Sequence, residues 1–336
     1  MTEQADSGPM IEPIKASILL ELEDEYTLAR HPAPSHSLPV AHPKGILLPG
    51  LDKRISSVWV GGHVVGVGSL SEVGGATPAK RSLPLHVLAT ALLSSATSPE
   101  PDTLRNVYII APHALQTVPM LHALLANTIS DSQAAIELLK PVRLLQYFDL
   151  AGIAESVAEV SDSLYRDSQK HERQCRTGHV HNLVLVQGIG PTVFATYRRS
   201  NLLQANALLA SLCRNITQLS RSLGDILVMV EFLVEVEEAD NMQQKQDAVR
   251  TRTARSMVLD SAFLGPRGET LRLASCHESL SRTLAASWDS VVAVHDGLGR
   301  ITDNKSSEEY RDQVVEVIKD RSGNLTGLWD VWKEAR

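Results

Sequence analysis

Continuous apolar runs alternate with stretches of helical periodicity over the first two-thirds of the chain. The predicted strands lie at residues 64–67, 106–111, 142–148, 183–186 and 226–236, and the continuously apolar run 106–111 is typical of a strand buried on both faces of a sheet. The stretches with apolar residues three and four positions apart, which predict helices, lie at residues 83–95, 114–125, 132–139, 153–166 and 199–223. This alternation predicts right-handed βαβ units and a mostly parallel sheet, with the most apolar strand, 226–236, at its centre.

The last part of the chain has a different rhythm. Short strand patterns and one helix, at 278–286, follow one another at residues 270–274, 290–295, 313–319 and 328–332. Such a succession favours antiparallel additions to one edge of the sheet. Four prolines within residues 31–44 indicate an extended linker. We therefore predict an N-terminal segment with its linker, 1–44, and a single α/β domain, 45–336.

A glycine-rich loop separates the first predicted strand from the first long helix. Strand, glycine-rich loop and helix form the layout in which backbone N–H groups bind a phosphate. Gly68, Gly74, Gly75 and Lys80 are the residues that would form this cradle. A working P-loop has the pattern G-x-x-x-x-G-K-[ST], whereas here Val73 replaces the second glycine and the lysine comes several residues late. The alternative is a glycine-rich turn that has no role in nucleotide binding.

Composition narrows the possible functions. The formal net charge of -7 argues against a surface that attracts nucleic acid everywhere, so any such contact requires a local basic patch. Aromatic residues make up only 4% of the chain, which argues against an extended platform for base stacking. The three cysteines are scattered and lack C-x-x-C spacing, which predicts a reducing compartment and no metal site. No apolar run approaches the length of a membrane span, so we expect a soluble intracellular protein.

Several sequence segments follow one another in an order that can be compared with that of a known family. The segment ISSVWVGGHVVG at 55–66 precedes the glycine-rich loop, and a long helix that starts at Arg199 leads into the most apolar strand. A polar stretch, an L-x-x-x-W turn at 284–288 and the basic segment VEVIKDR at 315–321 come later. In this order and spacing the chain resembles the RecA-type recombinases, most of all the degenerate eukaryotic recombinase paralogues of the Shu-complex kind. The resemblance runs from residue 47 to the C-terminus and implies a RecA-like P-loop fold.

The chain departs from that family where ATP chemistry is performed. Pro112 follows the strand after which the family has an Asp and a catalytic Glu, and Gln187 stands at the Walker B aspartate. Hydrolysis of ATP needs a phosphate-binding lysine and carboxylates that hold magnesium and orient water. We therefore expect a pseudo-ATPase with no cofactor, or with weakly bound ATP, and with no catalytic residue.

A protein that has lost catalysis keeps its fold for binding. In the resembling family, degenerate members belong to complexes that help recombinase filaments on single-stranded DNA. The resemblance thus implies a nuclear subunit for homologous recombination and DNA repair, partnered with recombinases or their paralogues in a hetero-oligomer. It predicts that strands 64–67 and 183–186 lie side by side in one sheet.

Two groups of arginines are candidates for binding nucleic acid. Arg250, Arg252 and Arg255 lie in the polar stretch 237–256, and Arg198 and Arg199 follow a Gly-Pro loop. Each could neutralise a phosphate. The alternatives are an ordinary solvated run beside acidic residues for the first group and surface charges of a helix for the second.

Other residues favour structural roles. His179 and His181 lack further ligands at metal spacing, so we expect surface histidines. Trp288 is expected in the core, and Trp329 and Trp332 are expected to dock on the sheet rather than to form an exposed partner-binding edge.

Two competing interpretations remain open. One is a Walker-less RecA-like subunit of the Elongator complex, which acts in tRNA modification. The other is an ATP-binding, DNA-dependent ATPase with an aberrant P-loop. The strand-rich C-terminal part with its basic segment favours the recombinase paralogue.

Overall fold

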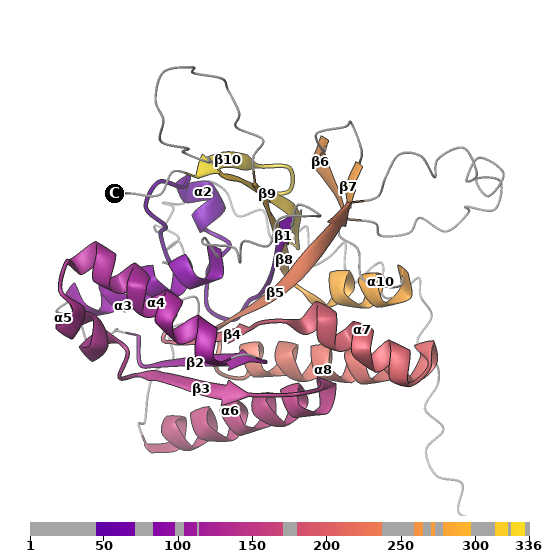
Figure 1. Cartoon of the computed structure of the whole chain (residues 1–336), viewed down its shortest axis with the longest axis horizontal. Helices are drawn as coiled ribbons and strands as arrows, with labels where there is room; N and C mark the ends of the chain where they lie inside the picture. The colour runs from indigo at the N-terminus through magenta and orange to yellow at the C-terminus, as the bar shows by residue number, and fades with distance from the viewer. Residues whose placement is uncertain are drawn as a thin grey trace, which may run out of the picture. The chain divides into compact units, whose positions relative to one another are not determined.

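The computed structural model describes residues 45–70, 83–97, 104–112, 114–170, 180–236, 259–264, 270–272, 278–296, 313–321 and 324–332. All of these residues belong to one compact unit, Pro43–Arg336. In this unit a twisted sheet is covered by helices on both faces (Figure 1).

Among the described residues, the main path of the sheet has the order β10-β9-β8-β1-β5-β4-β2-β3. These strands are β1 Val64–Leu70, β2 Asn106–Ala111, β3 Val142–Gln146, β4 Asn182–Val186, β5 Ile226–Val236, β8 Ser290–Asp296, β9 Gln313–Asp320 and β10 Trp329–Trp332. Neighbours from β8 to β3 are parallel, whereas β9 and β10 are added antiparallel. A short antiparallel hairpin, β6 Asp260–Leu264 and β7 Thr270–Arg272, extends the end of β5. The predicted α/β class, with a mostly parallel sheet and antiparallel C-terminal strands, is confirmed.

The helices divide between the two faces. One apolar cluster holds residues of α2 Lys53–Ser56, α3 Leu83–Thr97, α4 Ala114–Ile129 and α5 Ser132–Leu138. The other holds residues of α6 Leu150–Lys170, α7 Ile189–Arg199, α8 Leu202–Leu223 and α10 Glu278–Ser287. In β5, Val228 and Val230 belong to the second cluster and Leu227 and Met229 to the first. Because successive side chains of a strand point to opposite faces, a strand covered on both sides is apolar throughout.

Three details differ from the sequence prediction. The predicted helix 199–223 begins three residues later, as α8 at Leu202, because the Asn201 side chain caps it by accepting from the Gln204 N–H at 2.8 Å, and Arg199 ends α7 instead. The predicted Gly-Pro loop is the first turn of α7, where the missing N–H of Pro191 leaves no hydrogen bond unmade. Strands β1 and β4 share the sheet but are not side by side, since β5 pairs with both.

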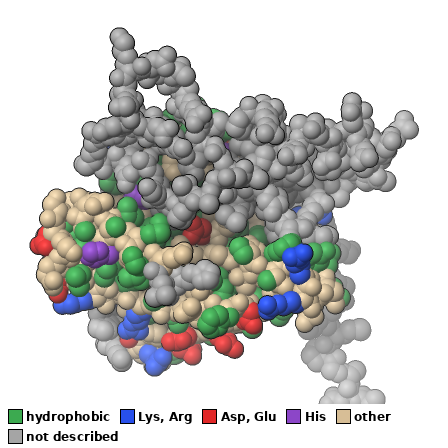
Figure 2. All heavy atoms as spheres, viewed as in Figure 1, with side chains coloured by type: hydrophobic (Ala, Val, Ile, Leu, Met, Phe, Trp, Pro, Cys, Tyr) green, Lys and Arg blue, Asp and Glu red, His purple; other side chains and the backbone are tan. Residues whose placement is uncertain are grey.

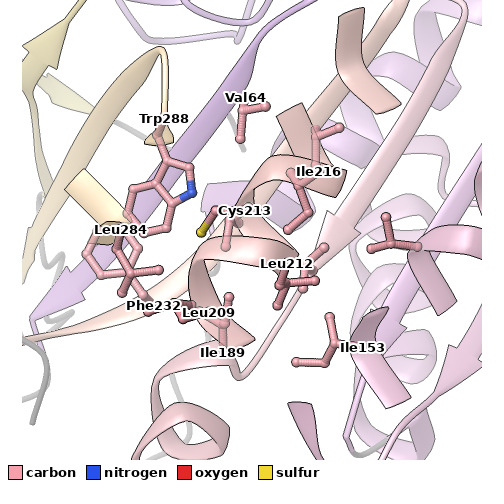
Figure 3. Packing of buried hydrophobic residues seen from close by; sticks show 14 of the residues in the cluster. Val64, Ile153, Ile189, Leu209, Leu212, Cys213, Ile216, Phe232, Leu284 and Trp288 are labelled. Atoms are coloured by element: carbon pink, nitrogen blue, oxygen red, sulfur yellow. The ribbon is translucent and has the colours of Figure 1, made fainter. Parts of the chain in front are cut away.

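Trp288 packs directly on the backbone of β1. A Cβ at Gly66 would lie 2.3 Å from the indole Cε3 atom, so this position of the strand has room for hydrogen alone. On its other side, the indole stacks on Phe232, with ring centroids 4.9 Å apart. Figure 3 shows Trp288, Phe232 and Leu284 gathered in the core, as predicted for Trp288.

Asp289, the next residue, fixes the start of β1. Its Oδ2 accepts from the Val64 N–H at 3.0 Å, and its own N–H donates to the Val64 carbonyl at 2.9 Å. Its Oδ1 accepts from Arg221 and from Arg321, each at 3.0 Å. Burial by itself would raise the pKa of Asp289, but the Val64 N–H and the two guanidinium groups outweigh it and hold the pKa below its usual value.

We expect Gly66→Ala to destabilise the protein by about 3 kcal/mol, because the new methyl group overlaps the indole and the close-packed core cannot yield. Chemical denaturation measures this loss. In a Trp288→Phe background the same substitution should have a smaller effect, since the smaller ring leaves space. An equal effect in both backgrounds would show that the contact with Trp288 is not the cause.

Candidate functional site

The crevice between the carboxyl ends of β2 and β4 is one place in the sheet where neighbouring connections diverge; β1 and β5 form another, because α3 and α10 belong to opposite faces. The chain leaves β2 into α4 on one face and leaves β4 into α7 on the other. In open α/β sheets, ligands bind at the carboxyl ends of strands where neighbouring connections diverge in this way. The position therefore defines the candidate site before any side chain is considered.

Gln187, the residue that follows β4, is held by both ends of its amide. Its Nε2 donates to Glu231 Oε2 on β5 at 2.7 Å, and its Oε1 accepts from the Thr117 hydroxyl on α4 at 2.7 Å. Its backbone N–H donates to the Ile110 carbonyl at 2.9 Å. One neutral side chain thus connects α4, β4 and β5 at the point where the resembling family has its Walker B aspartate.

Tyr147 closes the crevice from the side of β3. Its hydroxyl donates to the Gln187 carbonyl at 2.5 Å and accepts from Thr192 at 3.5 Å. Burial raises the pKa of Tyr147, an effect that the Thr192 hydrogen bond only partly offsets, so the phenol stays neutral and keeps its proton as a donor.

Gly188 lies in the narrow space between Pro112 and the Tyr147 hydroxyl. Its φ of +70° favours glycine, and a Cβ there would lie 2.9 Å from Pro112 Cγ and 3.0 Å from the Tyr147 hydroxyl. The N-terminus of α7 begins here without a side-chain cap. The chain's own groups therefore pack tightly against the end of β4.

Of the predicted phosphate cradle, the structure describes Gly68 alone. Gly68 is a buried residue of β1, with Phe232 and Ala293 as its partners on β5 and β8. Its neighbour Val67 is in register with Glu231, so the Gln187–Glu231 pair lies one strand away from the start of the glycine-rich loop. Gly74, Gly75 and Lys80 lie outside the described residues.

The predicted arginines do not belong to this crevice. Arg198 and Arg199 are exposed residues in the last turn of α7, not of a loop, and α7 carries them about 15 Å away from Gln187. The Arg198 guanidinium lies 5.0 Å from the centre of the half-exposed Phe194 ring, within the range of a cation–π contact. The other three candidates, Arg250, Arg252 and Arg255, lie outside the described residues.

The remaining candidates divide between core and surface. His181 is 5% exposed and therefore buried, so the prediction of a surface histidine is wrong for it, while His179 lies outside the described residues. Trp332 docks as predicted: it is buried and its indole N–H donates to the Pro49 carbonyl at 3.3 Å. Trp329 is 55% exposed, which corrects the expectation that both tryptophans dock on the sheet.

Sequence reasoning missed the partners of Gln187, namely Thr117, Tyr147 and Glu231. Only Glu231 gave a signal, since it is the first charged residue after five apolar ones in β5. Thr117 and Tyr147 reach the crevice from other elements, and nothing in their local sequence indicates this.

Metal sites and membrane-spanning helices are two further features to consider. Within the described part of the chain, no three His, Cys, Asp or Glu side chains are placed to hold a metal ion. Among the same residues, no helix combines the length and the apolar character needed to cross a membrane.

Comparison with known proteins gives a structural similarity. No family model matches the chain, and no curated protein matches it. The crystal structure of the RadB recombinase matches 85% of this chain and 94% of its own, with 15% sequence identity and a TM-score of 0.48. These values are too low to support any functional argument.

We expect Gln187→Glu to destabilise the protein by about 2 kcal/mol at neutral pH, because a second carboxylate replaces the donor to Glu231. The folded state raises the pKa of such a pair, so stability should recover at low pH and fall as pH rises through the raised pKa. Urea denaturation at several pH values measures this. Gln187→Leu, which adds no charge, is the control and should be destabilised without this pH dependence; the same pH response in both variants would argue against the carboxylate pair.

Proposed function

We propose that this chain is a non-catalytic RecA-like subunit that assists homologous recombination and DNA repair in the nucleus by binding a recombinase or a recombinase paralogue. The observation that carries the proposal is Gln187: a neutral amide, engaged by Thr117 and Glu231, occupies the place of the Walker B carboxylate. The resemblance in motif order supplies the link to recombination. In this proposal the fold is retained because its surfaces bind other molecules.

The chemistry of the crevice supports a non-catalytic role. A carboxylate at the end of β4 would stabilise magnesium and the charge that develops on a transferred phosphoryl group. The Gln187 amide carries no charge, and its donor and acceptor are both used within the protein. The nearest carboxylate of the network, that of Glu231, already accepts from this amide.

The free edge of β3 supports the binding of a protein partner. Within the described part of the sheet, β3 pairs with β2 alone and forms its edge. Leu144 on this edge is 38% exposed and Phe148 just beyond it is 89% exposed. Two cavities of about 690 and 480 Å³ follow the line between β3 and α6. An exposed edge suits an added strand, whose backbone pairs with the edge, while Leu144 and Phe148 offer apolar contacts beside two cavities with largely polar linings.

Arg198 and Arg199 support contact with single-stranded DNA. Both are exposed at the end of α7, next to the half-exposed Phe194. Guanidinium groups bind phosphates, and an exposed ring can stack on a base. Figure 2 shows apolar side chains among charged ones of both signs on the described part of this face.

We expect titration of the full chain with labelled ATP and magnesium to give weak binding at most and no turnover above background, since no carboxylate stands at the end of β4. A steady-state phosphate-release assay measures turnover, with a RecA-type recombinase of known activity as the positive control. Turnover that depends on magnesium would overturn the non-catalytic proposal and favour the DNA-dependent ATPase.

We expect Phe148→Asp to reduce recovery of the partner about tenfold when the tagged full chain is purified from its own cells, because a charge replaces the apolar anchor at the edge of β3. Quantitative mass spectrometry identifies and counts the partner. Leu203→Asp, at a residue 83% exposed on α8, is the matched control and should leave recovery unchanged. Recovery of two sister proteins in a six-membered ring, with no recombinase or paralogue, would contradict the proposal and favour the Elongator interpretation.

A further inference from the structure

A groove between the C-terminal halves of α8 and α10 is lined by arginines. The two helices run in parallel: Asn206 bonds to Ser279 and Thr283 near their beginnings, and Thr217 bonds to the Ser287 carbonyl near their ends. The groove has a volume of about 440 Å³. It lies near the start of β1, whereas Gln187 lies at the carboxyl ends of the parallel strands.

The arginines of the groove are arranged along a line. Arg214 and Arg221 are seven residues apart on α8, which places them on one side of the helix about 10 Å apart. Arg321 approaches from the end of β9, and its Nη1 donates to the same Asp289 oxygen as Arg221 Nη2. The shared carboxylate thus holds two guanidinium groups close together while most of their donors still point outward.

The local charge is strongly positive in a chain of net charge -7. None of the residues that line the groove is acidic. Lys319 lies behind it, where its ammonium donates to the Ala285 and Trp288 carbonyls, at 2.6 Å each. The Asp320 carboxylate is engaged elsewhere, where it accepts from the Ser290 hydroxyl and the Leu325 N–H. Among the described residues in these contacts, Asp289 is the carboxylate that binds Arg221 and Arg321, whereas three arginines line the groove.

Arg214 completes the arrangement. It is exposed, and it makes no hydrogen bond or ion pair with any residue that the structure describes. Its guanidinium is therefore available to a ligand, and its replacement should not disturb the fold.

We infer that this groove binds the phosphodiester backbone of a nucleic acid, at a site separate from Arg198 and Arg199. Guanidinium groups match phosphate oxygens with paired donors, and a row of them follows a row of phosphates. The apolar part of the lining is limited to Ala210, Ala286 and Cys213, so the groove lacks the large apolar pockets that anchor a peptide. It also lacks an aromatic ring for base stacking, so the contact is independent of base sequence.

The Cys213 thiol does not take part in this binding. Burial raises its pKa to about 11, so the sulfur is a neutral thiol near neutral pH. Figure 3 shows Cys213 directed into the core toward Trp288. The groove therefore offers its arginines, with Thr217, Gln218 and Ser287 beside them, to a ligand, and its affinity for phosphates should fall steeply with salt.

Binding of a labelled DNA duplex of about 20 base pairs to the full chain, followed by fluorescence anisotropy between about 50 and 200 mM salt, tests the inference. We expect Arg214→Glu to weaken binding about tenfold at the lowest salt and to reduce the salt slope by about 1 to 2. Arg321→Ala should act in the same direction, with thermal unfolding recorded to verify its fold. Arg54→Glu, at an exposed residue of α2 on the other face of the sheet, is the matched control and should change binding less than about twofold.

Equal losses for Arg214→Glu and Arg54→Glu would overturn the inference, because they would reflect net charge alone. Binding of a glutamate-rich peptide that depends on Arg214, without binding of DNA, would also overturn it and assign the groove to an acidic protein. The combined change of Arg198 and Arg199 to alanine separates this site from the proposed DNA contact on α7. Loss of DNA binding in that variant alone would support the α7 contact and exclude the groove.

Discussion

The carboxylate of Asp289 is the interaction on which the arrangement of this domain depends. It is buried, and it binds the first N–H of β1, a guanidinium from α8 and another from the end of β9. Removal of a partner from a buried charge is expensive, so this one group fixes the register in which β1 meets β8. Trp288, the adjacent residue, then lies flat against Gly66 and closes the core behind the same strand. Trp288 and Asp289 thus support the junction at which β8 pairs in parallel with β1 and antiparallel with β9.

Buried polar groups are satisfied in different ways at the two ends of the parallel strands. At the amino ends of the strands, the charged carboxylate of Asp289 is surrounded by donors, and cationic side chains lie at the surface nearby. At the carboxyl ends the Gln187 amide takes the place of a charge, with one donor and one acceptor satisfied inside the protein. A neutral pair of hydrogen bonds avoids the desolvation that an unpaired carboxylate would suffer there. The polar groups of Gln187 are therefore satisfied within the protein.

The sequence predicted the sheet better than the site, for physical reasons. Strands β2 and β5 were located to the residue, because strands covered on both faces are mostly apolar and leave a strong signal, which in β5 is interrupted by Glu231 and Glu235. The first turn of α7 was predicted as a loop, because glycine and proline occur both in first turns of helices and in loop turns. The partners of Gln187 come from α4, β5 and the end of β3, and no local pattern reports which strands become neighbours. His181 was misplaced for the same reason, since its burial depends on contacts that are distant in the sequence.

The crevice is not only neutral but also filled. The Tyr147 hydroxyl donates to the Gln187 carbonyl, and the absent side chain of Gly188 is what lets Pro112 and Tyr147 approach. A ligand that entered between β2 and β4 would have to displace a buried phenol whose hydrogen bonds are already satisfied, so it would lose those bonds before gaining its own. Binding at the surface meets no such competition, since the edge of β3 and the exposed arginines are already open to a partner. The filled crevice therefore agrees with the proposal that recognition takes place at the surfaces of the domain.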